Sequence, residues 1–130
     1  METFRLLIDG ALEDGAATLE SRDPFAGEPW AIMPEAQEAD VDRAVRAARR
    51  AGPAWAAMTA TARGRLLFAL ADRIAEAVPR LAALETRDTA KIIRETRAQV
   101  AYVADYWRYY AGLADKIEGR HLPIDKPDME

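Results

Sequence analysis

The chain has 130 residues, of which half are hydrophobic and 31% are charged, which is the composition of one globular domain and not of a disordered chain. A net charge of −4 argues against binding along a nucleic-acid backbone. The absence of cysteine excludes disulfides, thiolate zinc sites and a cysteine nucleophile within these residues.

The first third of the chain has the short apolar runs and turn signals that are typical of β-strands. Residues 4–8 form an apolar run that stops at Asp9-Gly10, and residues 16–22 can form a returning strand. A third strand is expected at residues 30–33. We therefore predict a small antiparallel meander of strands and turns over residues 1–36.

From about residue 38 the hydrophobic spacing changes to that of amphipathic helices. The first helix is expected to bury a stripe made of Val41, Ala44, Val45, Ala48 and Ala51. Gly52-Pro53 is expected to end this helix, because proline lacks the N–H that a helix interior needs.

Three more helices are expected before the C-terminal tail. The second is capped by Thr59 or Thr61 and has an apolar face of Leu66, Leu67, Leu70, Ile74 and Val78. Pro79 predicts a break, followed by a short helix over residues 81–85. The last helix is expected from about Glu95 to Ile117, with Gly119 as its stop. The fold class is thus a mostly α, α+β fragment with a helical segment at 37–119 and an extended tail at 120–130.

One spacing in the sequence suggests a metal site. Asp115, Glu118 and His121 are three residues apart, so helical geometry could direct the two carboxylates at one ion. His121 follows the expected helix stop at Gly119, and its direction is therefore not fixed by the helix. The alternative interpretation is an ordinary solvated helix end.

Aromatic residues are concentrated on the last predicted helix. Trp107 and Tyr110 fit the buried stripe, together with Val100, Val103, Ala104, Ala111, Ala114 and Ile117. Tyr102, Tyr106 and Tyr109 lie on the flank, where they could contact a ligand or a partner surface. Core and interface roles are favoured over a small-molecule pocket formed by this chain alone.

Several segments, in a fixed order, resemble the start of an aldehyde dehydrogenase. The matching stretches are Leu7-Ile-Asp-Gly10, Ser21-Arg-Asp-Pro-Phe-Ala-Gly-Glu28, Ala39-Asp-Val-Asp-Arg-Ala-Val45, Leu70-Ala-Asp-Arg-Ile74, Leu81-Ala-Ala-Leu-Glu-Thr86, Arg108-Tyr-Tyr-Ala-Gly-Leu-Ala-Asp-Lys-Ile-Glu-Gly119 and Leu122-Pro-Ile-Asp125. They cover nearly the whole chain. The resemblance implies a Rossmann-type α/β parent that oxidises an aldehyde with NAD or NADP through a cysteine thioester.

The resemblance also assigns two minor roles to residues that are present. Some members of the family hold a monovalent cation, K⁺ or Na⁺, and the matching ligands are the backbone carbonyls of Ser21 and Arg22 and the carboxylate of Asp88. The chain departs from the family pattern at Ala90 and Ile92, where glycine and proline are usual. In the family the last long helix of this segment lines the substrate entrance, and the resemblance implies the same role for three residues here. These are Ala98, Tyr102 and Tyr106.

We therefore predict the N-terminal portion of an NAD(P)-dependent aldehyde dehydrogenase, truncated before the cofactor-binding and catalytic regions. The isolated chain is expected to be inactive and to bind neither NAD nor NADP alone. Its expected partners are the remainder of the subunit and, in the parent, further copies of it, with no nucleic acid and no membrane. The expected location is the cytoplasm. The alternative is a stand-alone helical module that binds another protein without catalysis.

Overall fold

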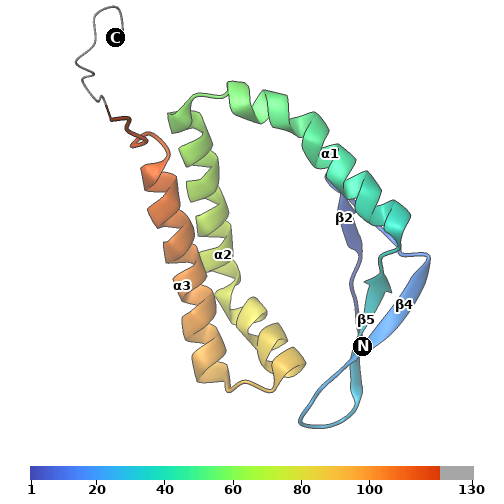
Figure 1. Cartoon of the computed structure of the whole chain (residues 1–130). Coiled ribbons are helices and arrows are strands. Elements are labelled where there is room, and N and C mark those ends of the chain that lie inside the picture. Colours follow the sequence, from blue (N-terminus) through green and yellow to red (C-terminus); the bar gives the residue numbers. More distant parts are fainter. Residues whose placement is uncertain (121–130) are drawn as a thin grey trace, which may run out of the picture.

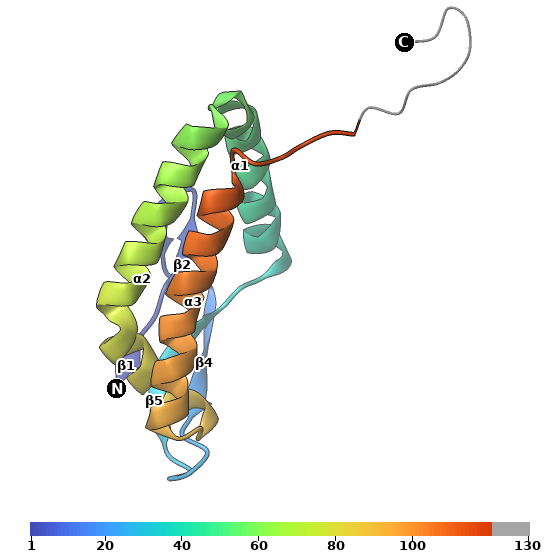
Figure 2. The ribbon, with the colours of Figure 1, turned by 90° about the vertical axis from the view of Figure 1, so that its left-hand side faces the viewer.

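The computed structural model describes residues 1–120, in which five strands precede three helices. The strands are β1 (Glu2–Thr3), β2 (Leu6–Ile8), β3 (Ala11–Glu13), β4 (Ala17–Arg22) and β5 (Pro29–Glu35), and the helices are α1 (Glu38–Ala57), α2 (Ala60–Thr89) and α3 (Ile93–Leu113). Figures 1 and 2 show α2 and α3 side by side as an antiparallel hairpin, with α1 and the strands on one side of it. The predicted mostly α, α+β fold is confirmed.

The strands form two separate small sheets. β2 and β3 pair as an antiparallel hairpin around Asp9-Gly10, whose φ values of 53° and 79° are those of the tight turn that favours this dipeptide. The other sheet has the order β1-β5-β4. β4 and β5 are antiparallel as predicted, but β1 is parallel to β5. The prediction of a purely antiparallel meander is therefore wrong at β1. Parallel strands are joined by a long connection, so no turn residue in the sequence marks this pairing.

Helix α1 does not end at Gly52-Pro53, as predicted, but continues to Ala57. All side chains from 48 to 57 are exposed, so water can replace the hydrogen bond that Pro53 cannot donate.

At the start of α1, the Gln37 backbone N–H donates to the Asp40 carboxylate at 3.0 Å. This bond, followed by the Arg43 side chain, lowers the pKa of Asp40. The ionised Asp40 carboxylate therefore stabilises the folded chain at neutral pH, and this stabilisation is lost as the pH falls through the lowered pKa.

Helix α2 is one continuous helix with Pro79 inside it, and the predicted break with a separate short helix is wrong. The α2 ribbon changes direction in its C-terminal third in Figure 1, in the region of Pro79. A bend is the expected response of a packed helix to proline, since contacts with a neighbour keep both halves in place. Thr59 caps α2 as predicted by accepting a hydrogen bond from the Ala62 backbone N–H at 3.2 Å.

The core of the hairpin is made of small residues. Gly64, Ala71 and Ala82 of α2 are buried opposite the buried residues Thr96, Val100, Ala104 and Ala111 of α3. Small side chains let the two helix axes approach closely. The predicted leucine face of α2 is therefore wrong in part, because Leu66 and Leu70 are exposed while glycine and alanine face α3. Across the far end of the hairpin, the Thr86 and Thr96 hydroxyls form a 2.7 Å hydrogen bond.

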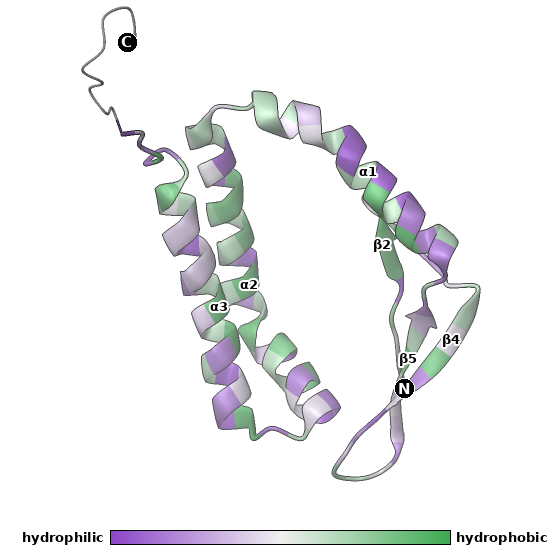
Figure 3. Ribbon diagram, viewed as in Figure 1, coloured by the Kyte–Doolittle hydropathy of each residue, from purple (hydrophilic) through white to green (hydrophobic). Residues whose placement is uncertain are grey.

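Apolar surface remains uncovered on α1 and on the outer side of α3. Val41 and Val45, both in the predicted buried stripe of α1, are 56% and 44% exposed, and only Ala47 of this helix is buried. Ion pairs fasten α1 to the β2–β3 hairpin, Arg43 with Glu13 and Arg50 with Asp9. Trp107 and Tyr110, predicted as core, are also accessible. Figure 3 shows hydrophobic residues in green alternating with hydrophilic residues in purple along α1.

The turn after α2 contains a strained alanine. Ala90 has φ 59°, in the left-handed region that glycine adopts without strain. We expect Ala90→Gly to raise the free energy of unfolding by about 1 kcal/mol, because the strain of the methyl group is removed. Urea unfolding followed by circular dichroism measures this change. Ala98→Gly is the matched control, since Ala98 is exposed within α3, and it is expected to lower stability by about 1 kcal/mol.

Candidate functional site

The structure brings Ser21 and Asp88 together, although they are 67 positions apart. Ser21 lies near the end of β4 and Asp88 in the last turn of α2. The Ser21 hydroxyl donates to Oδ1 of Asp88 at 2.5 Å, and the Trp30 indole Nε1–H donates to the Ser21 Oγ at 3.1 Å. Two of the three residues predicted for a monovalent cation are thus in direct contact.

Arg22, the third predicted ligand residue, forms its side-chain hydrogen bonds with groups other than Asp88. Its guanidinium donates to the Glu20 carboxylate at 2.9 Å and to the Gly27 carbonyl at 3.3 Å. The predicted ligand is the Arg22 backbone carbonyl, and the register places Arg22 opposite Pro29. Proline has no N–H, so Pro29 cannot donate a hydrogen bond to that carbonyl.

Oxygen ligands of this kind fit a hard monovalent cation. A carboxylate and backbone carbonyls are the donors that such an ion prefers, and no nitrogen or sulfur atom belongs to the set. Among residues 1–120, no lysine or arginine forms an ion pair with Asp88, although Arg87 precedes it. The Arg87 guanidinium instead lies 5.5 Å from the centre of the Trp30 ring. The negative charge of Asp88 is therefore accessible.

The turn that follows Asp88 has the backbone conformation that glycine and proline favour, although Ala90 and Ile92 stand at those positions. Ala90 adopts the left-handed conformation, and Ile92 has φ −71° and ψ 138°, which are values that proline would favour. The departures from the family pattern at these two positions therefore leave the local backbone suited to glycine and proline. Lys91 is held by Glu85 at 2.8 Å and by Gln99 at 3.2 Å.

A small apolar hollow adjoins Asp88 between the sheet and α2. Phe4, Trp30, Met33 and Leu84 form its walls, Asp88 lies at its edge, and its volume is about 300 Å³. Phe4 and Trp30 meet edge to face, with ring centres 6.0 Å apart. Aromatic side chains of the N-terminal region therefore lie beside the carboxylate of Asp88 on α2.

The residues predicted for the substrate entrance share one exposed face of α3. Ala98, Tyr102 and Tyr106 are four residues apart and all are exposed. The Tyr102 and Tyr106 rings have centres 6.2 Å apart, and the hydroxyls of Tyr106 and Tyr110 form a hydrogen bond at 3.2 Å. This hydrogen bond raises the pKa of Tyr110, because it stabilises the neutral phenol. The face is a row of aromatic rings with polar tips.

The metal site considered at Asp115, Glu118 and His121 does not have the helical geometry on which it depended. Helix α3 ends at Leu113, four residues before its predicted end, and Asp115 pairs with Lys116. His121 and the predicted tail lie outside the described residues, and no metal-binding cluster is found within 1–120. At this end the Ala114 backbone N–H donates to the Ala111 carbonyl at 3.3 Å, which tightens the last turn.

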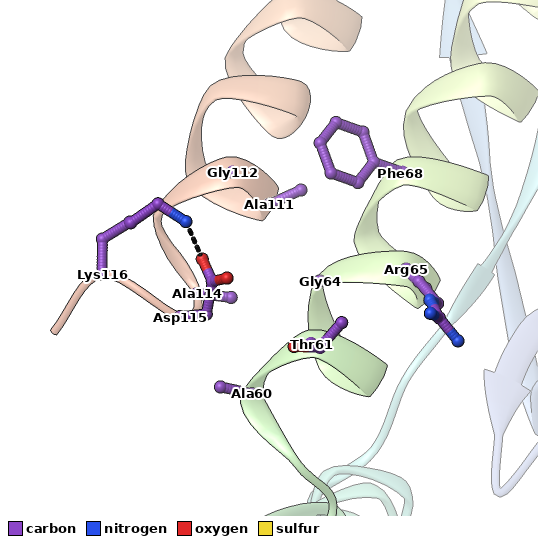
Figure 4. A pocket seen from close by; sticks show the side chains of 10 residues that line it. All are labelled: Ala60, Thr61, Gly64, Arg65, Phe68, Ala111, Gly112, Ala114, Asp115 and Lys116. Atoms are coloured by element: carbon purple, nitrogen blue, oxygen red, sulfur yellow. Dashed lines mark hydrogen bonds and ion pairs between the residues drawn. The ribbon is translucent and has the colours of Figure 1, made fainter.

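A second hollow lies where the start of α2 meets the end of α3. Figure 4 shows Gly64 of α2 close to Ala111 of α3, with Phe68 on one side and the Asp115–Lys116 ion pair on the other. The volume is about 220 Å³. Among residues 1–120, the charged residues that line it are Arg65, Asp115 and Lys116, and all three are exposed, so it offers no dry environment for acid–base chemistry. Separately, no helix within 1–120 is both long and apolar enough to cross a membrane.

Comparison with known proteins gives consistent matches over almost the whole chain. The model of the aldehyde dehydrogenase family matches residues 12–130. The (Z)-2-((N-methylformamido)methylene)-5-hydroxybutyrolactone dehydrogenase of Acinetobacter baylyi is 58% identical over 132 residues, covering 100% of this chain. The chain spans 27% of the length of this relative.

Solved structures show the same similarity. PnpE from Pseudomonas sp. WBC-3 is 44% identical with a TM-score of 0.87, covering 96% of this chain and 26% of that one. A betaine aldehyde dehydrogenase variant from Staphylococcus aureus, solved with NAD⁺, is 36% identical with a TM-score of 0.88, covering 98% and 27% of the two chains.

Proposed function

Because this chain belongs to the aldehyde dehydrogenase family, we propose that it is the N-terminal portion of a subunit that oxidises an aldehyde to a carboxylic acid with NAD or NADP. We use "complete subunit" for the polypeptide that contains this segment together with cofactor-binding and catalytic regions. The observation that carries the proposal is the 58% identity to a dehydrogenase over the whole chain, of whose length the chain spans 27%.

The segment supports catalysis in this proposal and does not perform it. Family chemistry needs a cysteine nucleophile, and the chain has none. Its contribution is a scaffold: the apolar face of α1, with Val41 and Val45 exposed, is suited to packing against the cofactor-binding region. Assembly of the complete subunit into a homo-oligomer belongs to the same proposal.

The row of tyrosines on α3 is proposed to form part of the substrate entrance. Tyr102 and Tyr106 present two exposed rings on the same face as Ala98, and exposed aromatic rings can pack against a flat substrate. The Acinetobacter relative is named for a hydroxybutyrolactone that bears a conjugated methylene group. A flat, conjugated aldehyde or its ring-closed form is therefore the proposed substrate class.

A chimera tests the proposed role directly. The matched 27% of the Acinetobacter dehydrogenase is replaced by this chain, and NAD-dependent oxidation is measured. We expect a soluble and active chimera, whereas the same enzyme without the segment is expected to be inactive. A folded chimera without activity would argue for the alternative, a protein-binding module, which the uncovered face of α1 also suits.

The cation site gives a second test, on Asp88 in the complete subunit. If Asp88 binds K⁺ or Na⁺, these ions stabilise the subunit relative to a bulky organic cation, by about 2.7 kcal/mol at a hundred times the dissociation constant. Asp88→Ala is expected to remove most of this specific stabilisation. Melting curves in potassium, sodium and tetramethylammonium chloride at equal ionic strength measure it.

Two further variants complete the cation experiment. Asp88→Asn keeps an oxygen ligand without the charge and is expected to retain part of the effect. Asp42→Ala removes a different exposed carboxylate and is expected to change stability equally in all three salts. An equal shift for Asp88→Ala in all salts would make Asp88 a structural turn residue only.

A further inference from the structure

Trp30 is the residue at this site that sequence patterns did not single out. Its side chain is nearly buried, at 4% exposure, although it lies on a short sheet. Ser21 is opposite Ala31 and Arg22 is opposite Pro29, so Trp30 is the additional residue of a bulge in β5. A bulge redirects a side chain away from the regular alternation of a strand. Here the side chain reaches Ser21.

The hydrogen bonds from Trp30 to Asp88 can run in only one direction. An indole nitrogen only donates, and an ionised carboxylate only accepts. The Ser21 hydroxyl therefore accepts from Trp30 at 3.1 Å and gives its single proton to Oδ1 of Asp88 at 2.5 Å. Trp30 thus fixes the direction of the Ser21 hydroxyl, and Ser21 in turn holds one oxygen of the carboxylate.

Trp30 has a second contact that affects the same carboxylate. The Arg87 guanidinium lies 5.5 Å from the indole ring centre, a cation–π geometry. Arg87 is the residue before Asp88, and an arginine released from the ring could turn toward that carboxylate. Because the ring attracts Arg87, the charge of Asp88 is left for a cation from solution. Arg22 is likewise engaged by Glu20 and by the Gly27 carbonyl.

We infer that Trp30 is a positioning residue of the monovalent-cation site: through Ser21 it orients the Asp88 carboxylate, and through its ring it holds Arg87 away. The inference rests on the proposed cation site. Trp30 itself contributes no oxygen and does not contact the ion. Its effect is on affinity for K⁺, by presenting Asp88 in one orientation and without a competing arginine.

Trp30→Phe in the complete subunit tests the orienting role. Phenylalanine keeps an aromatic ring for Arg87 but cannot donate to Ser21. The readout is the K⁺ concentration that gives half of the maximal rise in melting temperature, at ionic strength held constant with tetramethylammonium chloride. We expect this concentration to rise about tenfold, since a hydrogen bond in a charged network is lost. Trp55→Phe, at an exposed tryptophan of α1, is the matched control and is expected to leave it unchanged.

Two more variants separate the roles of the ring and the hydrogen bond. Trp30→Leu removes both and is expected to weaken K⁺ binding more than Trp30→Phe does. Adding Arg87→Gln to Trp30→Leu is expected to recover part of the loss, because the freed arginine no longer competes. Ser21→Ala interrupts the hydrogen bonds at a half-buried position and provides the same test if Trp30→Phe does not fold.

The outcomes distinguish this inference from the cation site on which it rests. If Asp88→Ala loses the K⁺ effect while Trp30→Phe or Ser21→Ala keeps the wild-type half-maximal concentration, the cation site stands and the role of Trp30 is wrong. If the wild-type subunit shows no difference between potassium and tetramethylammonium, the cation site is wrong and the role of Trp30 is overturned with it.

Discussion

The purified 130-residue chain is expected to form no NADH or NADPH above the blank when mixed with an aldehyde and the oxidised cofactor. The chain contains no cysteine, so no thiolate can attack the carbonyl and no thiohemiacetal can pass a hydride to the nicotinamide. The expected activity of the isolated chain is zero, which is a larger difference from the complete subunit than any single substitution in this segment would produce. Absorbance of the reduced nicotinamide measures it.

Two controls show that a lack of cofactor reduction reflects the chain and not the assay. The chimera described above is assayed at the same concentration and is expected to be active, which shows that the aldehyde and cofactor are competent. Enzyme from the expression host is excluded by purifying a chain that carries an affinity tag and by assaying a mock purification. Cofactor reduction that scales with the amount of tagged chain would contradict the expectation.

The types and order of the elements could be predicted from hydrophobic period and turn residues, but several boundaries could not. Pro53 and Pro79 were both expected to end helices, because proline removes a hydrogen bond. In the structure α1 leaves Pro53 exposed to water, and α2 accommodates Pro79 with a bend while packing on α3. Whether a proline terminates or bends a helix depends on tertiary contacts that a local pattern does not contain.

The helix faces were predicted less well than the helices. Leucine marked the expected buried face of α2, but the close approach to α3 places Gly64 and Ala71 there instead. The stripe of α1 is uncovered because, within residues 1–120, this helix contacts mainly β2. Its amphipathic pattern agrees with the proposed packing of this face against the cofactor-binding region.

The candidate cation site could be assigned only through resemblance, because Ser21 and Asp88 have no local relation in sequence. Their contact depends on the fold placing the end of β4 beside the last turn of α2. Trp30 was expected only as part of a strand. A bulky aromatic residue directly after Pro29 is a weak signal of a bulge, and the role of its Nε1–H becomes clear only from the contact with Ser21.

The second large effect is expected at Gly64, where the start of α2 packs closely against the end of α3. A Cβ atom added there would lie 2.9 Å from the carbonyl oxygen of Ala111 and 3.5 Å from the Ala114 side chain. The obstacle at 2.9 Å is a backbone atom of α3, so unlike a flexible side chain it cannot rotate away (Figure 4). We expect Gly64→Ala to lower the free energy of unfolding by about 1–3 kcal/mol, because the helices must separate.

Gly112→Ala is the matched control for this prediction. Gly112 lies in α3 beside Ala111, but no atom lies within 4 Å of an added Cβ, so the methyl group enters open space. Alanine there is expected to stabilise the helix by about 0.5–1 kcal/mol, through its higher helix propensity. Urea unfolding of the 130-residue chain, followed by circular dichroism at the helical band, compares the two variants with wild type. Opposite signs are expected for the same chemical change. If Gly64→Ala stabilised the chain as Gly112→Ala does, helix propensity would outweigh packing, and α2 and α3 would not be in the close contact that the structure shows.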